Sequence, residues 1–296
     1  MTDLDRRSRT GTADSSFIKE WEAWHRAHDE VLAGPHGFLA ITNIHWLDGI
    51  PRRFDDAPGA WWRDGEEVRA ELSDGERLQM DGQDQQLQVN FGAIPERSSI
   101  FAYWDDNAVE VAKRGGYDLV RPRHPGNPLR AAFKGTPLFD PDPAWALPGR
   151  YVPFPEARPT TVGSVVEGLA HVYLAIGRVE LEVGGEAFAL TAFDGRRPGE
   201  LTLLFTDATS GLTTYGACRS LTIGPPGEDG RVTVDFNRAV NLPCAYTDLA
   251  TCPLPPAENG LTIAIEAGAM MPRERRDGAA PQTPRPPLPG TRGRAN

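Results

Sequence analysis

The chain is 296 residues long, enough for one large domain or two of ordinary size. Hydrophobic residues make up 40% and charged residues 24%, a globular mixture that can bury a core. With 41 acidic against 31 basic residues, the net charge of -10 repels phosphate backbones and argues against non-specific nucleic-acid binding. The 27 prolines and 31 glycines favour turns over long helices.

Residues 1–14 are polar and predict a disordered leader, because so few apolar groups cannot offset the entropy lost on ordering. They contain no apolar core of a signal peptide, and no stretch of about 18 apolar residues occurs anywhere. Three cysteines are too few for a disulfide scaffold. We therefore expect a cytoplasmic protein without a membrane span.

One long helix is expected from Ser15 or Ser16 to about Leu32, where Gly34-Pro35 follows and stops it. Its aromatic and aliphatic residues recur at steps of three and four, the helical period. These residues are Phe17, Trp21, Trp24, His28 and Val31 or Leu32. We interpret His25 and His28 as packed or solvated side chains, and the two tryptophans as the face that docks on a sheet.

Short apolar segments punctuated by turn residues then predict a β lobe that, with the helix, covers residues 15–120. Asp-Gly pairs occur at Asp64-Gly65, Asp74-Gly75 and Asp81-Gly82 and indicate hairpin turns. Residues 121–160 are rich in proline, which removes ladder donors, so we expect a long connection rather than a central strand.

A second β lobe is expected over residues 161–272, with Gly184-Gly185 as a two-residue hairpin turn. The Arg-, Pro- and Gly-rich residues 273–296 predict a disordered tail. The fold class is therefore mostly β: an N-terminal helix, two sandwich-like or barrel-like lobes, and a long Pro-rich connection.

A dense motif stands late in the chain. The motif consists of Asp235-Phe236-Asn237, Asn241, Pro243-Cys244, Tyr246, Cys252-Pro253, Pro255-Pro256, Asn259 and Glu266-Ala267-Gly268. This segment resembles the C-terminal signature of the bacterial and archaeal family called domain of unknown function 1684. The resemblance extends over about residues 17–272 and implies a fold neighbourhood but no established activity.

The chain departs from the family pattern at three places. Cys218-Arg219 replaces a Gly-Arg, Ala269-Met270 replaces a Glu-Lys, and residues 52–60 replace an N-terminal pattern. If a replaced segment carries an activity, this chain has changed or lost it.

The same motif predicts a ligand site on physical grounds, because prolines stiffen a loop that gathers polar side chains. We assign Glu266 and Asp235 as catalytic residues. A carboxylate facing the interior after the apolar run 261–265 would have a raised pKa suited to acid–base work. The ligand-binding candidates are Asn237, Asn241, Tyr246, Asn259 and Arg219. The alternative is structural: Asp and Asn build turns, Tyr246 fills a core, and Glu266 pairs with Arg219.

Cys244 and Cys252 are thiol candidates, and four roles stay open for them: buried inert thiols, a redox or disulfide pair, a nucleophile, or metal ligands. His171 is the nearest candidate for a third ligand, but a zinc site usually has four. We therefore expect no metal, and no cofactor fingerprint is found.

The leading hypothesis is a cofactor-independent protein whose partner is a small molecule held in the second β lobe. It is either a hydrolytic or isomerising enzyme or a binder. The alternatives are a non-catalytic interaction module using the Trp-rich first half, and a thiol or metal protein using Cys244 and Cys252. The substrate, the oligomeric state and whether the protein is an enzyme stay open.

Overall fold

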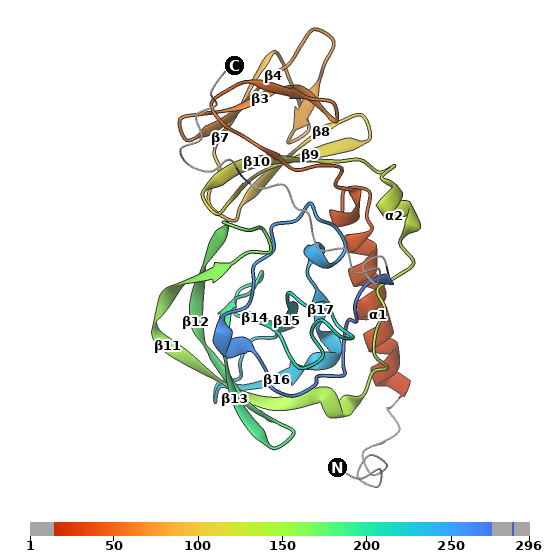
Figure 1. Ribbon diagram of the computed structural model, residues 1–296, viewed down its shortest axis with the longest axis vertical. Coiled ribbons are helices and arrows are strands. Elements are labelled where there is room, and N and C mark those ends of the chain that lie inside the picture. Colours follow the sequence, from red (N-terminus) through yellow and green to blue (C-terminus); the bar gives the residue numbers. More distant parts are fainter. Residues whose placement is uncertain (1–14, 274–285, 287–296) are drawn as a thin grey trace.

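The computed structural model describes residues 15–273 and residue 286. The leader 1–14 and nearly all of the tail 273–296, both expected to be disordered, lie outside the described residues. The described chain is mostly β and forms two lobes stacked along the long axis of the molecule (Figure 1). We call residues 41–123 the N-lobe, and residues 128–273 with the N-terminal helix the C-lobe.

The predicted helix is confirmed as α1 (Ser15–Leu32). It is followed by the short 3-10 helix η1 (Phe38–Ala40), in which Leu39 is buried. The buried indole of Trp21 donates a hydrogen bond from Nε1 to the carbonyl oxygen of Asn237, at 2.9 Å. The helix thus packs on the loops of the C-lobe, although the sequence suggested a lobe formed with residues up to 120.

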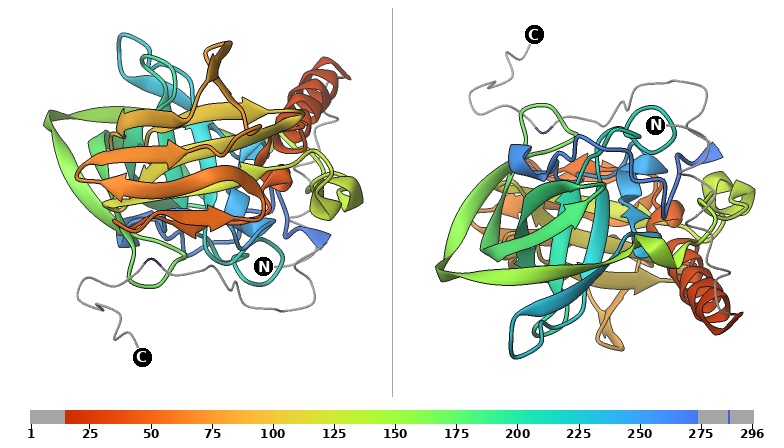
Figure 2. Two further views of the ribbon diagram at one scale, coloured as in Figure 1. Left: turned by 90° about the horizontal axis from the view of Figure 1, so that it is seen from above. Right: turned by 90° about the horizontal axis from the view of Figure 1, so that it is seen from below.

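The N-lobe is a sandwich of two antiparallel sheets, with strand orders β2-β3-β4-β7 and β1-β10-β9-β8-β5-β6. Figure 2 (left) shows the first lying across the second. The core between them includes Trp61, Val68, Val109 and Val111. The strands are β1 (His45–Trp46), β2 (Arg52–Phe54), β3 (Ala57–Asp64), β4 (Glu67–Glu71), β5 (Leu78–Met80), β6 (Gln83–Gln85), β7 (Gln88–Ala93), β8 (Ser99–Trp104), β9 (Asn107–Arg114) and β10 (Tyr117–Arg123).

Two of the three Asp-Gly pairs lie at hairpin turns. Gly65 follows β3 with a φ of 63°, and Asp81-Gly82 joins β5 to β6 with φ values of 49° and 75°. The left-handed region is accessible to Gly and tolerated by Asp, which explains the signal. Gly75 instead lies in the wider connection from β4 to β5, since β4 pairs with β7.

The C-lobe is built on one curved antiparallel sheet of seven strands in the order β16-β11-β12-β13-β14-β15-β17. The sheet stays open between its edge strands, so this lobe is not a closed barrel. Gly184-Gly185 forms the predicted hairpin turn between β12 and β13. The strands are β11 (Ala146–Gly163), β12 (Ala170–Val183), β13 (Glu186–Asp194), β14 (Leu201–Phe205), β15 (Arg219–Ile223), β16 (Arg231–Asp235) and β17 (Val240–Asn241).

Short helices and irregular chain fill the concave side of this sheet. Figure 2 (right) shows the sheet curving around the segment that follows β16. Phe236, Leu261 and Ile265 of that segment pack against strand residues such as Leu203 and Leu221. The helices are α2 (Pro128–Ala132), η2 (Pro143–Trp145), η3 (Phe236–Arg238), η4 (Pro243–Ala245) and η5 (Ala257–Asn259). Among the described residues no helix is both long enough and apolar enough to cross a membrane.

The expectation that the Pro-rich segment contains no central strand was wrong. Strand β11 begins at Ala146 and pairs with β16 on one side and β12 on the other. Its register shifts between Pro153 and Arg158, so the strand bends where prolines would interrupt the ladder. Proline therefore changed the shape of this strand instead of abolishing it.

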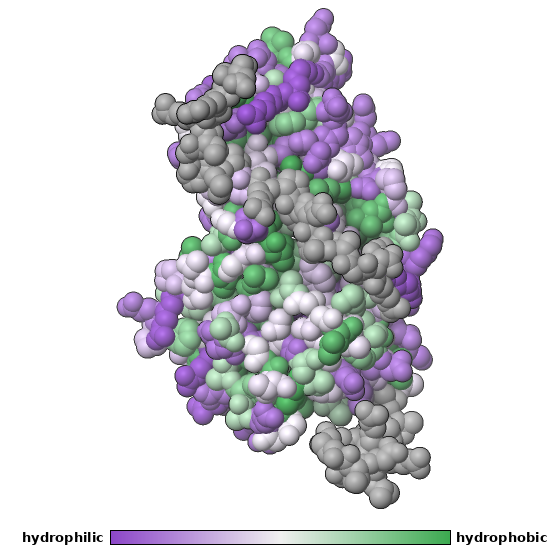
Figure 3. Space-filling view, viewed as in Figure 1, coloured by the Kyte–Doolittle hydropathy of each residue, from purple (hydrophilic) through white to green (hydrophobic). Residues whose placement is uncertain are grey.

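The N-lobe is inserted between two parts of the chain that meet. Ile41 bridges to Arg123, and the amide of His124 donates to the carbonyl of Ala40 at 2.8 Å. The insertion thus enters and leaves at one point. In Figure 3 the surface of this lobe is largely hydrophilic, whereas apolar residues are frequent at its junction with the C-lobe.

Candidate functional site

Glu266 does not form the sheltered carboxylate that the sequence suggested. The run 261–265, expected as a strand, is irregular. Buried and exposed residues alternate there, and Glu266 is exposed between buried Ile265 and Ala267. It forms no hydrogen bond or ion pair with any described residue. The desolvation that would tune it for acid–base chemistry is therefore absent.

Asp235 and Asn237 are used by the backbone. One carboxylate oxygen of Asp235 accepts from the amide of Asn237 and so caps η3. The buried Asn237 side chain donates from Nδ2 to the carbonyl of Asp142 at 2.8 Å and accepts from the amide of Asp142 at 2.9 Å. Both side chains fasten the entry of β11 to the end of β16.

Asn259 and Arg219 also stabilise the fold. The side chain of Asn259 is fully buried. Its Oδ1 accepts from the backbone N–H of Thr191, and its Nδ2 donates to the carbonyls of Thr191 and Leu204. Arg219, equally buried, pairs with Asp207 at 2.7 Å rather than with Glu266. The structural alternative for these two residues therefore has direct support in their contacts.

All three cysteines are buried, and none is joined to another by a disulfide. The amide of Cys244 donates to Sγ of Cys252 at 3.2 Å. The hydrogen bond with Cys252, together with burial, raises the pKa of the Cys244 thiol well above its ordinary value, which opposes nucleophilic use. His171 Nε2 bonds the carbonyl of Thr251 instead of facing a metal. Within residues 15–273 no group of three potential ligands is suitably placed for a metal ion.

Asn241 and Tyr246 do line a hollow, and α1 covers it. The hollow is too narrow for a water molecule and lies between Trp24, His25 and His28 of the helix and the loops of the C-lobe. Ala269, at the position where the family pattern has Glu, is part of its wall. Asn241 Nδ2 donates to the carbonyl of Met270 at 2.7 Å, while its buried Oδ1 has no hydrogen-bond partner among the described residues.

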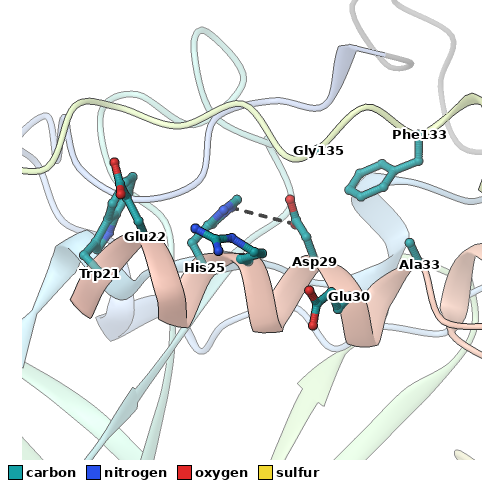
Figure 4. A pocket seen from close by; sticks show the side chains of 9 residues that line it. Trp21, Glu22, His25, Asp29, Glu30, Ala33, Phe133 and Gly135 are labelled. Atoms are coloured by element: carbon teal, nitrogen blue, oxygen red, sulfur yellow. Dashed lines mark ion pairs between the residues drawn. The ribbon is translucent and has the colours of Figure 1, made fainter. Parts of the chain in front are cut away.

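An open groove of about 600 Å³ runs along the outer side of the same helix (Figure 4). Figure 4 shows His25 and Asp29 pointing from α1 toward the segment that carries Gly135. The lining residues are Trp21, Glu22, His25, Arg26, Asp29, Glu30, Ala33, Phe133 and Gly135. The sequence analysis missed this groove, although the spacing of four between His25 and Asp29 on a helix places them on one face.

A hydrogen-bonded chain links the groove to the hollow. The two oxygens of Asp29 accept from the hydroxyl of Thr136 at 2.8 Å and from its amide at 3.1 Å. The Thr136 hydroxyl also meets the hydroxyl of Tyr246 at 2.8 Å. Since Tyr246 lines the hollow, Thr136 joins the two spaces, and Asp29 is held in one orientation.

His25 Nε2 lies 3.8 Å from Oδ1 of Asp29. Burial lowers the pKa of His25, and the charge of Asp29 only partly opposes this. Burial also lowers the pKa of His28. A lowered pKa favours the neutral form of both imidazoles at pH 7, so neither places a full positive charge beside Asp29.

Fold and motif together define a mostly β protein whose polar signature loops are closed over by an N-terminal helix. The chain belongs to the family described as "Protein of unknown function (DUF1684)", whose model matches residues 131–270. The match contains Thr136, Asn241 and Tyr246, whereas α1 and the N-lobe precede it. The family resemblance seen in the sequence is thereby confirmed over residues 131–270, and the part of it that was placed before residue 131 lies outside the match.

No curated protein matches the sequence. Among solved structures, an uncharacterized protein of Haloarcula marismortui, determined by solution NMR, is similar at 30% sequence identity. The similarity covers 48% of this chain and 78% of that one, with a TM-score of 0.41.

Proposed function

We propose that this protein binds a small organic cation, such as an amine, in the groove along α1. The observation that carries the proposal is the charge of the lining. The lining includes three carboxylates, those of Glu22, Asp29 and Glu30, but only one guanidinium, that of Arg26. An opposite charge on the ligand would be attracted into such a groove, and the side chain of Phe133 offers an apolar wall.

The orientation of Asp29 supports this role. Two of its acceptor positions are taken by Thr136, which fixes the orientation of the carboxylate, and a carboxylate can accept further bonds from an ammonium group. The neutral His25 beside it does not compete for the charge. It can also accept a proton, so acid–base chemistry on the bound amine is open to this site.

The test is a binding screen with small primary and quaternary amines, with carboxylic acids of matched size as the contrast. We expect amines to raise the melting temperature and acids to leave it unchanged. Calorimetry on the best amine should then show at least about tenfold weaker binding for Asp29→Asn, the loss expected when a charged hydrogen bond is removed.

Two further variants keep the outcome clear. Glu30→Gln removes a lining charge without touching Thr136, so weaker amine binding there cannot come from a disturbed Asp29 network. Glu20→Gln removes an exposed charge of the same helix outside the groove and should bind like the wild type. Equal responses to amines and acids, or equal affinity in all three variants, contradicts the proposal.

A docking module built on exposed tryptophans has less support. All seven tryptophans lie in the described part of the chain, and each is buried or half-buried. The exposed large apolar residues include Val172 and Leu174 on β12 and Leu212 in a loop. Tyr103 is the only aromatic residue among the exposed large apolar residues in the described part of the chain, so an aromatic patch of the kind that anchors a protein partner is not found there.

A further inference from the structure

A cluster of arginines around one glutamate lies on the N-lobe, on the face opposite its sandwich core. In β9, Val109 and Val111 point into that core, and Glu110 between them points to the other face. The strand register sets Glu110 opposite Arg121 of β10 on one side and opposite Phe101 of β8 on the other. Neighbouring side chains of this face therefore converge on Glu110.

Three guanidinium groups donate to this one carboxylate. Arg121 binds it through Nε at 3.1 Å and Nη2 at 2.7 Å, and Arg114 binds it through Nη2 at 3.2 Å. Arg123 also donates to Glu110, and its other terminal nitrogen donates to the carbonyl of His36 at 2.7 Å. Glu110 is the only carboxylate in the described chain that pairs with any of the three.

The cluster is buried, and its charges do not cancel. Glu110, Arg121 and Arg123 expose between 2% and 4% of their surface. Three cations against one anion leave an excess of two positive charges, which Glu96 near Arg114 offsets only in part. Buried charge without a counter-charge is strongly unfavourable, so the arrangement calls for a further anion.

Arg219 of the C-lobe is a buried arginine whose charge is matched by one carboxylate, and it offers a comparison. Arg219 faces one carboxylate, Asp207, and its remaining terminal N–H groups donate to the carbonyls of Ile265 and Ala267. That cluster is electrically balanced. Main-chain acceptors serve both clusters, since Nη1 of Arg114 donates to the carbonyls of Ser98 and Lys113. In both clusters one arginine Nε, that of Arg219 or Arg123, is buried without a hydrogen-bond partner among the described residues, so the difference lies in the charge balance. The Glu110 cluster is not balanced, although it belongs to the same chain and has similar burial.

Aromatic rings border the surplus charge on the side that faces the C-lobe. The Arg123 guanidinium lies 4.8 Å from the ring centroid of Phe38 and 5.1 Å from that of Phe101. Phe38 itself packs against the buried cluster that includes Cys244 and Tyr246 of the C-lobe. The nitrogen Nε of Arg123 is buried without a hydrogen-bond partner among the described residues. The cluster thus lies at the seam between the lobes.

We infer that the arginine cluster of Arg114, Arg121 and Arg123 at this seam is a binding site for a small oxyanion carrying two negative charges, of phosphate or carboxylate chemistry. Guanidinium groups match the oxygens of both, and an anion would offset the excess of positive charge. This site is separate from the α1 groove and takes a ligand of the opposite charge.

The experiment measures the melting temperature of the full chain against inorganic phosphate, with sodium chloride adjusted to keep the ionic strength constant. We expect a saturable rise of about 3 °C at 10 mM phosphate, the size expected when a ligand is present well above its dissociation constant. A parallel series with malonate distinguishes a dicarboxylate from a phosphate ligand. A saturable rise with either anion supports the inference.

Variants separate this site from a general salt effect. Arg114→Gln should lose at least half of the rise, and Arg114→Lys, which keeps the charge, should retain most of it. The matched control is Arg97→Gln in the same lobe. Arg97 stacks on Tyr173 at 3.6 Å and does not pair with Glu110, so its removal should leave the rise unchanged.

The ³¹P NMR line width of inorganic phosphate gives a readout that does not depend on stability, because the phosphate resonance broadens when the ion binds the protein. This broadening should be weaker with Arg114→Gln than with the wild type, and unchanged with Arg97→Gln. The inference is overturned if phosphate, malonate and chloride act alike at equal ionic strength. It is equally overturned if Arg114→Gln and Arg97→Gln respond to phosphate to the same extent.

Discussion

The two lobes each bury an arginine–carboxylate cluster, and the clusters differ in their charge balance. In the C-lobe one Asp207 faces one Arg219, both with fully buried side chains. In the N-lobe one Glu110 faces three arginines. The chemistry of each single pair is the same, but the charges balance in one cluster, and positive charge is in excess in the other. Burial of an ion pair therefore does not by itself distinguish structure from binding, whereas the sum of the charges does.

In the balanced cluster, Arg219 donates hydrogen bonds to backbone carbonyls that would otherwise be bonded by a neighbouring strand. Residues 261–269 have no strand partners over most of their length, and Arg219 donates to the carbonyls of Ile265 and Ala267 there. One side chain thus satisfies an irregular segment inside the curve of the sheet. This explains why arginine, with its fork of donors, stands at that position.

Breaking the balanced cluster should have the largest effect. Arg219→Met leaves Asp207 buried without its counter-charge and removes the donors to three carbonyls, those of Ile265, Ala267 and Ala269. We expect the free energy of unfolding to fall by about 3–5 kcal/mol, measured by urea denaturation. Arg231→Met, at an exposed arginine of β16, is the control and should change the stability little. A loss no larger than that of the control would show that the pair contributes nothing.

The three arginines around Glu110 should make the stability of the protein depend on pH in the acidic range. Burial would raise the pKa of Glu110, but the arginines outweigh it and lower the pKa from 4.5 to about 2. Such a carboxylate contributes stability above its ordinary pKa, and the contribution is lost as the pH falls from 4.5 towards 2. We expect a loss of about 3 kcal/mol over this window.

Urea midpoints recorded at pH 5, 4, 3 and about 2 measure this loss, and Glu110→Gln provides the control. That variant should be less stable at pH 5, and its stability should depend less on pH between 4.5 and 2. Phosphate should recover part of the stability of Glu110→Gln, and it should raise the stability of Arg219→Met by about as much as that of the wild type, because that variant keeps the arginine cluster of the N-lobe intact. Identical pH profiles for wild type and Glu110→Gln would remove the basis of the comparison.

A smaller effect is expected from the neutral side chains of the C-lobe. Asn259→Ala leaves the amide and carbonyl of Thr191 and the carbonyl of Leu204 without their partner, and should cost about 2–3 kcal/mol. Asn241→Ala strips only the carbonyl of Met270 and should cost about half as much. Thermal unfolding of both variants checks the order. The reverse order would mean that Asn241 makes the greater structural contribution.

The smallest effect is expected at Glu266, the carboxylate first assigned to catalysis. Because it is exposed and bonds no described residue, Glu266→Gln should change stability by less than about 0.5 kcal/mol. It should also leave amine binding unchanged in the calorimetric assay. A clear loss of amine binding in this variant alone would restore the site that the sequence suggested.

Local signals in the sequence predicted the local parts of the fold. The helix up to Leu32 and the turns at Asp81-Gly82 and Gly184-Gly185 follow from periodicity and from residues that tolerate positive φ. The strand β11 could not be predicted this way, because its prolines are accommodated by a register shift against β12 that depends on a distant partner. The sequence shows where the prolines are. It does not show at which positions a β-ladder can do without the backbone N–H that proline lacks.

The candidate sites divide in the same way. The pairing of His25 with Asp29 follows from helical spacing, and that of Glu110 with Arg121 from counting outward from Gly115-Gly116, the turn between β9 and β10. The contact of Asp29 with Thr136 spans 107 positions, and no local pattern indicates it. The alternation that turns Glu266 outward also depends on how the irregular segment packs, which the apolar run did not reveal.

The docking of α1 has a consequence for how the chain is made. The indole of Trp21 bonds a carbonyl 216 positions later. At ribosomal rates of about 5–20 residues per second, the helix waits on the order of 10–40 s before its partner emerges. The N-lobe is synthesised in that interval, and its ends already meet where Ile41 bridges Arg123. A nascent chain halted midway would therefore display a finished sandwich beside an amphipathic helix with nothing to cover it, a species that chaperones recognise.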